Sequence, residues 1–271
     1  MGGYDYIFSI GYRCSSAGII KSLGLKHESY PFDWMVSRLP IIEHCIKDDF
    51  VEFLDPTNYT KKHSASYGYT SKDPKSRQWL CDESIFVNNY YETRFLESAD
   101  EQTKARMGLY LSDHLCEEHD SYYHKLTINH HDISTEKDQK YYSRCVDRWK
   151  TLYEYTNKLS LYIHPMIFQE DAHLIPKIQE DIRRFHKNTF STDGIYIIIV
   201  KTPHDDPTNH CAKYVLEEQP DDESVPNCRI CILWANRDFF DAGEIFSGNC
   251  YIETCVVKEY VKKTAEKGKL L

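Results

Sequence analysis

A cysteine stands where an apolar strand-like run gives way to a helical pattern. In SIGYRCSSAGIIKSLGL, residues 9–25, the apolar run 6–10 reaches Gly11, and Cys14 precedes apolar residues at helical spacing. The unpaired N–H groups and positive potential at a helix start favour a thiolate and stabilise an oxyanion formed beside it. Arg13 adds a neighbouring cation. Cys14 is therefore a candidate nucleophile; the alternative is a small buried hydrophobe.

A nucleophilic cysteine needs a base, and the base needs an orienting group. LTINHHDIS, residues 126–134, places His130, His131 and Asp132 after a strand-like run and before a predicted helix with Ser134 as its N-cap. Adjacent side chains of an extended segment point to opposite sides, so at most one of the two histidines faces a site. The alternative is a solvated loop whose Asp132 or Ser134 caps the helix. Two further histidines are weaker candidates for the base: His63 and His164.

A carboxylate stands between two aromatic residues in PFDW, residues 31–34. Burying the Asp33 carboxylate beside such rings costs free energy unless it gains a partner, for which Arg13, Arg38 or a histidine is expected. With such a partner, Asp33 would belong to a functional site. The alternative is a buried structural ion pair or a helix N-cap.

Two arginines lie four residues apart in RCVDRW, residues 144–149. On a helix, Arg144 and Arg148 would share one face, a spacing suited to clamping an anionic group. We take both, with Arg13, as candidate substrate-binding residues. The alternative for the helical pair is contact with surface carboxylates.

The elements around these residues predict an α/β fold. Strand-like runs at 6–10, 159–164, 195–200 and 230–234 alternate with helical patterns, as in a mainly parallel open sheet flanked by helices. A further strand is predicted within NCYIETCVV, residues 249–257. We expect a single domain over residues 1–271, with an irregular middle insertion at 56–133 that is polar and rich in Tyr and His.

The cysteines do not predict a metal centre. Cys228 and Cys231 form a C-x-x-C inside CRICILW, where strand alternation puts the two sulfurs on opposite faces. Zinc ligands normally converge from a turn, so we expect neither a metal nor a cofactor.

Composition excludes several classes of protein. The chain has 271 residues and a net charge of -9, which disfavours nonspecific binding to nucleic acid or to an anionic membrane. The start of the sequence lacks a signal-peptide pattern, and no apolar stretch is long enough to span a membrane. We expect a soluble cytoplasmic protein, of unknown oligomeric state.

The motifs SIGYRCSSAGIIKSLGL, SYPFDWMVSRL, HHDI and RCVDRW together resemble a family described as papain-like cysteine peptidases, found in bacteria and in large DNA viruses. The resemblance implies Cys14 as nucleophile and a histidine, carried to His131, as base. Asp33, or else Asp132, would orient the imidazole. The resemblance also raises an α+β papain-like fold as the alternative, and the host cytoplasm as the location if the protein is viral.

The function expected from these motifs is a cysteine-dependent hydrolase, a papain-like peptidase or another acyl-transfer enzyme. Its substrate would be a peptide, another acyl compound or a glycan. Two alternatives stay open: an α/β protein that binds or modifies a glycan or a phosphate ligand, and a non-catalytic interaction module.

Overall fold

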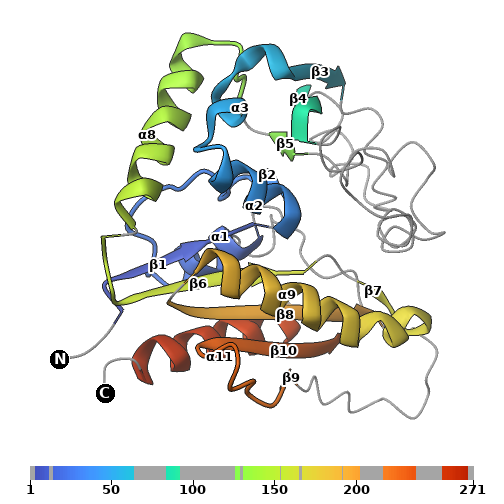
Figure 1. Cartoon of the computed structure of the whole chain (residues 1–271). Helices are drawn as coiled ribbons and strands as arrows, with labels where there is room; N and C mark the ends of the chain where they lie inside the picture. Colours follow the sequence, from blue (N-terminus) through green and yellow to red (C-terminus); the bar gives the residue numbers. More distant parts are fainter. Residues whose placement is uncertain are drawn as a thin grey trace. The chain divides into compact units, whose positions relative to one another are not determined.

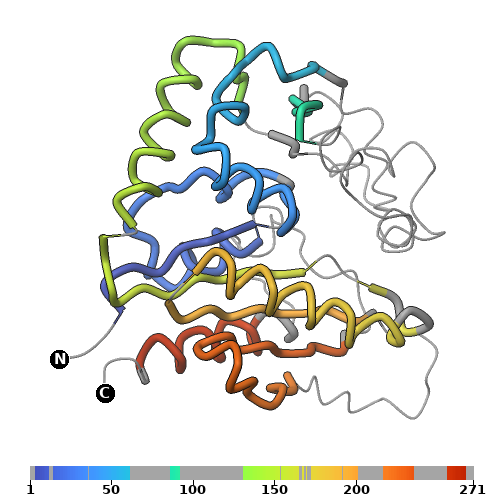
Figure 2. Tube along the Cα trace, viewed as in Figure 1, coloured from blue at the N-terminus to red at the C-terminus, as the bar shows by residue number. Residues whose placement is uncertain are grey.

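The structure is a computed structural model of the chain, whose Cα trace is drawn in Figure 2. It describes residues 4–11, 15–63, 84–91, 126–128, 131–152, 154–164, 167–190, 192–201, 216–235 and 252–267. The chain divides into two compact units, residues 1–29 with 150–271 and residues 30–149. The second unit thus extends further on both sides than the insertion expected at 56–133.

A mainly parallel sheet forms the centre of the first unit, in the order β1-β6-β8-β10-β9, with β7 paired to β8 (Figure 1). Its strands are β1 (Tyr6–Ser9), β6 (Lys158–Ile163), β7 (Ile167–Phe168), β8 (Asp193–Lys201), β9 (Leu216–Glu218) and β10 (Cys228–Ala235). Its helices are α1 (Ser15–Ser22), the 3-10 helix η3 (Gln169–Leu174), α9 (Ile175–Thr189) and α11 (Ile252–Lys267).

The four strands predicted from the sequence lie in this sheet and run parallel to one another. β1 pairs with β6, β6 with β8, and β8 with β10. Among the strands that the structure describes in this sheet, β9 alone is antiparallel, on the outer side of β10. The predicted α/β class is confirmed, and the alternative of an α+β papain-like fold is not what the chain adopts.

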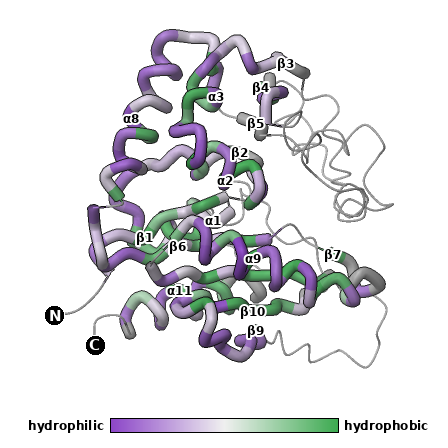
Figure 3. Tube along the Cα trace, viewed as in Figure 1, coloured by the Kyte–Doolittle hydropathy of each residue, from purple (hydrophilic) through white to green (hydrophobic). Residues whose placement is uncertain are grey.

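Helices cover both faces of the sheet. Ile195 and Ile197 of β8 belong to a core cluster with residues of α1 and α11. Tyr196, between them, points to the other face, where its hydroxyl lies 2.9 Å from Nδ1 of His186 on α9. Figure 3 shows the result in hydropathy: β8 and β10 are hydrophobic, whereas β9 is hydrophilic. A strand buried on both faces needs an uninterrupted apolar run, as the sequence of β8 has.

The strand predicted within residues 249–257 is wrong, because α11 begins at Ile252. Val257, Val261 and Ala265 of α11 are buried in the core cluster, and their spacing of four residues places them on one helical face. Packing of this face outweighs the preference of the β-branched residues for strands.

The second unit contains a small antiparallel sheet in the order β2-β5-β4-β3. Its strands are β2 (Met35–Val36), β3 (Tyr59–His63), β4 (Ser84–Asn88) and β5 (Leu126–Ile128). Its helices are α2 (Leu39–Lys47), α3 (Val51–Leu54), the 3-10 helix η1 (Pro56–Asn58) and α8 (Glu136–Leu152), whose last residues belong to the first unit. Three of these strands fall in the segment 56–133, which we expected to be irregular apart from the strand-like run before His130, where β5 lies.

Aromatic rings form the core of the second unit. Phe32 is fully buried, and its ring lies 5.1 Å from that of Trp149 on α8 at an interplanar angle of 87°. Phe50 and Phe53 complete the cluster around Phe32 at centroid distances of 5.8 and 6.2 Å. The pairs of Phe32 with Trp149 and Phe53 are edge-to-face, an arrangement that stabilises a core beyond the area that it buries.

None of the helices in the described ranges is long and apolar enough to cross a membrane.

Candidate active site

The predicted nucleophile lies in the sequence between β1 of the parallel sheet and α1. Pairing with β6 continues one residue past β1, since the Ile10 N–H donates to the Leu161 carbonyl at 3.0 Å. Gly11 follows with φ at 96°, in the left-handed region that favours glycine. Arg13 and Cys14 lie outside the described residues, and α1 begins directly after them at Ser15. The predicted strand-to-helix position of Cys14 is therefore flanked on both sides by the expected elements.

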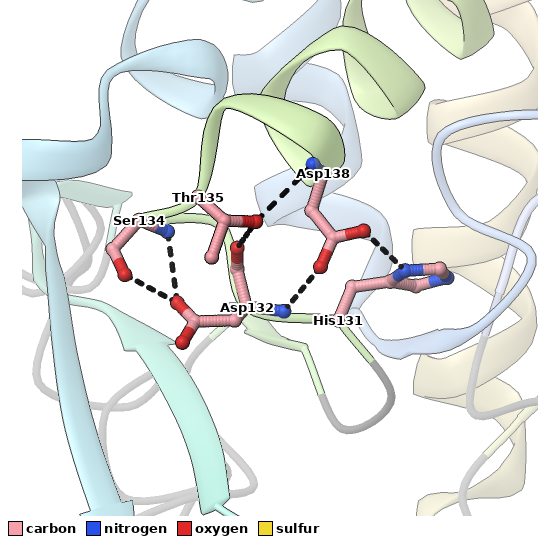
Figure 4. Close-up of polar contacts among 5 residues, drawn as sticks. All are labelled: His131, Asp132, Ser134, Thr135 and Asp138. Carbon is pink, nitrogen blue, oxygen red and sulfur yellow. Dashed lines mark hydrogen bonds and ion pairs between the residues drawn. The ribbon is translucent and has the colours of Figure 1, made fainter.

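A histidine and a carboxylate form a pair at the start of α8 (Figure 4). Nδ1 of His131 lies 3.1 Å from Oδ1 of Asp138, and the two side chains are 26% and 15% exposed. Nε2 of His131 makes no hydrogen bond with any residue that the structure describes. A carboxylate on Nδ1 leaves the proton of a neutral imidazole on that nitrogen, and Nε2 then carries the free lone pair. This imidazole can accept a proton at Nε2.

Aromatic rings restrict the His131 imidazole further. The Tyr141 ring stacks on it at a centroid distance of 4.4 Å and an interplanar angle of 19°. The Tyr142 ring meets it edge-on at 5.6 Å and 79°. The hydrogen bond fixes one edge of the imidazole while the stack covers one face, so the ring has a defined orientation before any substrate binds.

The other contacts of this segment fold the chain into α8 (Figure 4). The Asp132 carboxylate accepts hydrogen bonds from the N–H of Ser134, at 3.0 Å, and from its hydroxyl. The Thr135 hydroxyl accepts the N–H of Asp138 at 3.3 Å, as an N-cap does. The cap is thus Thr135, one residue later than the Ser134 that we predicted, because α8 begins at Glu136.

The structure pairs His131 with Asp138, and neither Asp33 nor Asp132 bonds to its imidazole. Asp33 is fully buried, as its aromatic neighbours predict, and Oδ2 of its carboxylate accepts the Tyr30 N–H at 2.8 Å. This contact closes a tight turn from Tyr30 to Asp33, in which the Asp33 N–H also donates to the Tyr30 carbonyl at 3.3 Å. Asp33 therefore holds the backbone that carries Phe32 into the aromatic core.

The remaining candidate residues lie on α8, directly after β6 and at the end of β3. Arg144 is exposed on α8 and Arg148 is half-buried. His164 follows β6, is 9% exposed, and donates its backbone N–H to the Ile197 carbonyl at 2.7 Å. His63 ends β3, opposite Ser84.

The C-x-x-C pair is divided between the faces of the sheet, as alternation predicts. Cys231 packs in the cluster with α1 and α11, and Cys228 belongs to the alternate set of β10 side chains, opposite Gly194. Both are free thiols. No cluster of three or more metal-ligating side chains occurs within the described ranges.

The contact of Asp138 with the imidazole was not predicted from the sequence, from which we expected Asp33 or Asp132 as the partner. Its signal was present: an acidic residue in the first turn of a predicted helix, three residues after a threonine, matches a capping box. In an ordinary box this side chain reaches back to the N-cap amide. Here Oδ2 of Asp138 accepts the Asp132 N–H at 2.8 Å instead, which leaves Oδ1 for His131.

The first part of the chain is similar to a known family. Residues 5–108 match the model of a family described as "Putative papain-like cysteine peptidase". The matched range includes Cys14 and Asp33 and ends before His131 and Asp138. No curated protein and no solved structure matches the chain.

Proposed function

We propose that the chain is a cysteine-dependent hydrolase in which the Cys14 thiolate is the nucleophile and His131 is the base. The observation that carries the proposal is the geometry of His131, with Nδ1 on the Asp138 carboxylate and Nε2 unbonded by the described residues. The family match over residues 5–108 supports the same chemistry from the side of Cys14. In this proposal Asp138 takes the orienting role that we expected of Asp33 or Asp132.

The reaction is acyl transfer. Nε2 of His131 takes the proton of the Cys14 thiol, and the sulfur attacks the carbonyl carbon of the substrate, forming an S–C bond and an oxyanion. The imidazolium returns the proton to the leaving group as the bond from carbon to that group breaks. Water, deprotonated by the same imidazole, then attacks the thioester and releases the acid and the thiol. The Asp138 carboxylate stabilises the imidazolium in both halves of the cycle.

We propose peptides as the first substrate class, and other acyl compounds as the second. Arg13, Arg144 and Arg148 are proposed to bind an anionic part of the substrate. Replacing Arg144 and Arg148 with Gln should then raise KM for acidic substrates more than for neutral ones. Equal changes for both substrates would contradict this role.

Selective alkylation tests the proposal without a known substrate. Iodoacetamide at pH 6.5, followed by mass spectrometry, should label Cys14 at least tenfold faster than Cys255, an exposed free thiol on α11. A thiolate held by a base reacts at a pH where an ordinary thiol is protonated. His131→Gln should abolish the advantage of Cys14 and leave Cys255 unchanged.

The matched control is His27→Gln, because His27 is an exposed histidine outside the proposed site. It should leave both rates at their wild-type values. A Cys14 that reacts no faster than Cys255 in the wild-type chain would contradict the proposed function. Peptide amides and simple thioesters, compared as substrates, then distinguish a peptidase from another acyl-transfer enzyme.

A further inference from the structure

Two buried serine side chains, those of Ser9 and Ser16, form hydrogen bonds with the backbone of Gly11, three residues before Cys14 in the sequence. Ser9 ends β1 and is 1% exposed, and Ser16 lies in the first turn of α1 and is fully buried. Their Oγ atoms are 2.6 Å apart. Ser9 Oγ also accepts the Gly11 N–H at 3.2 Å, and the Ser16 hydroxyl donates to the Gly11 carbonyl at 2.7 Å. Strand, turn and helix are thereby joined through three residues.

The number of protons fixes the direction of each bond. A serine hydroxyl donates one hydrogen bond only. The Ser16 hydroxyl donates its proton to the Gly11 carbonyl. The hydrogen bond between the two hydroxyls must therefore be donated by Ser9 and accepted by Ser16. The bonds therefore form a closed circuit: Gly11 N–H to Ser9, Ser9 to Ser16, and Ser16 back to the Gly11 carbonyl. Each member both donates and accepts.

The circuit holds both polar groups of the one residue whose backbone is left-handed. The φ of Gly11 is 96°, and its N–H and carbonyl are each bonded to a serine side chain. Both peptide planes at Gly11 are thus fixed. Burying hydroxyls costs free energy that their hydrogen bonds only offset, so alanines would fill the same space in a core without this cost. What the hydroxyls add is a defined backbone conformation at Gly11.

We propose that Ser9 and Ser16 are positioning residues for Cys14, acting through Gly11 and the first turn of α1. The inference rests on the proposed function, because it takes Cys14 as the nucleophile. Cys14 lies three residues after Gly11 and two before Ser16, so the circuit clamps the chain on both sides of it. A nucleophile displaced by a fraction of the reaction distance loses much of its rate.

Two readouts on Ser16→Ala and Ser9→Ala test the inference. Ser9→Ala removes the acceptor of the Gly11 N–H, and Ser16→Ala removes the acceptor that holds the Ser9 hydroxyl in place. Both should speed amide hydrogen exchange at Gly11 at least tenfold and slow Cys14 alkylation at least fivefold. Because the circuit acts as a unit, the double variant should slow alkylation hardly more than either single variant does.

Ser22→Ala is the matched control, since the Ser22 hydroxyl donates to the Ile19 carbonyl at 2.9 Å, at the far end of the same helix. It should change neither readout. Wild-type exchange at Gly11 and wild-type alkylation in the two serine variants would overturn the inference. So would faster exchange with unchanged Cys14 alkylation, because the circuit would then be structural only.

Failure of the proposed function has a different signature: wild-type Cys14 reacts no faster than Cys255. That outcome overturns both proposals, whereas an unchanged rate in the serine variants overturns this inference alone. If one serine variant fails to fold, the other decides the question, because both break the same circuit.

Discussion

Asp138 binds His131 and the backbone beside it with the two oxygens of one carboxylate. Oδ1 lies 3.1 Å from Nδ1 of the imidazole, and Oδ2 accepts the N–H of Asp132 at 2.8 Å (Figure 4). The second bond fixes the carboxylate relative to the chain that carries His131. The orientation of the imidazole is therefore set within eight residues of sequence, at the start of a single helix.

Removing the Asp138 carboxylate should change the tautomer of His131. In the wild-type chain the neutral ring is expected to carry its proton on Nδ1, facing Asp138, whereas a free imidazole has no such constraint. In Asp138→Ala, the 15N chemical shifts of the ring should move toward the Nε2–H form. Cys14 alkylation at pH 6.5 should fall together with this shift.

Asp138→Asn separates orientation from charge. Its amide oxygen still accepts from Nδ1–H, so the tautomer should stay closer to wild type than in Asp138→Ala. Asp138→Ala removes the acceptor of the Asp132 N–H, and Asp138→Asn weakens this bond or removes it. Either change should lower the free energy of unfolding by about 1–2 kcal/mol. Unchanged 15N shifts in Asp138→Ala would exclude the positioning role, whatever happens to stability.

Stability should fall on acidification because of a buried histidine in α9. Burial lowers the pKa of His186 from 6.5 to about 4, although the nearby Asp193 opposes the shift. As the pH falls, His186 therefore becomes protonated near pH 6.5 in the unfolded chain but only near pH 4 in the folded chain. The contribution to stability is present above pH 6.5 and is lost as the pH falls from 6.5 toward 4, by up to about 3 kcal/mol.

Urea unfolding measured at pH 7, 5.5 and 4 checks this slope. His186→Gln keeps a polar partner for the Tyr196 hydroxyl but does not titrate, so the fall between pH 6.5 and 4 should become shallower. His27→Gln, which replaces an exposed histidine, should leave the slope as it is. A wild-type slope in His186→Gln would show that other groups dominate the acid response.

A glycine of β8 should be intolerant of any side chain. A Cβ built on Gly194 would lie 2.8 Å from a ring carbon of Tyr196 and 3.0 Å from ring atoms of His186. These rings are buried and hydrogen-bonded to each other, so they cannot move aside cheaply. Gly194→Ala should therefore lower the free energy of unfolding by about 1–3 kcal/mol.

Gly24 provides the comparison for Gly194. It has φ at 69° and open space around it, so Gly24→Ala should cost about 1 kcal/mol through backbone strain alone. Asn tolerates a left-handed backbone and should recover part of this loss at position 24, but not at position 194. Chemical denaturation of the four variants measures both effects. Recovery by Asn at position 194 would rule out the steric explanation.

The parallel sheet could be predicted from the sequence because its signals are local. The apolar run of β8 requires cover on both faces, and alternation in β10 assigns Cys228 and Cys231 to opposite faces. The prediction for residues 252–257 was wrong because their β-branched and apolar composition suits a strand, whereas α11 buries Val257 in the core cluster on one face with Val261 and Ala265.

The polar contacts of the candidate site depend on chain geometry that no spacing rule reveals. Asp138 was visible as a capping residue, but its bond to His131, seven residues earlier, requires the turn formed by Asp132 and Thr135. The circuit of Ser9 and Ser16 includes both backbone polar groups of Gly11, whose φ is positive. Residue types could identify the candidates, and only the fold selects their partners.

A half-buried carboxylate in the second unit should weaken the folded state at neutral pH. Asp48 lies between α2 and α3, and the Tyr91 hydroxyl donates to its Oδ1 at 3.2 Å. Burial raises the pKa of Asp48 above its usual value of 3.8, although the bonds from Tyr91 and from the Phe50 backbone partly counteract the shift. The folded chain thus holds a proton on Asp48 at a pH where the unfolded chain has lost it.

The sign of this effect is opposite to that of His186. The stabilising contribution of protonated Asp48 to the free energy of unfolding is fully present below pH 3.8. It is lost as the pH rises through the raised pKa of the folded state. At pH 7 the ionised carboxylate therefore destabilises the fold. Asp48→Asn keeps an acceptor for Tyr91 and carries no charge. It should raise the free energy of unfolding at pH 7 and have a smaller effect near pH 3.

The control is Asp221→Asn, at an exposed aspartate, which should change the free energy of unfolding at neither pH. A less stable Asp48→Asn at pH 7 would mean that the charge is compensated in the folded chain, and that burial is not the dominant influence on this carboxyl.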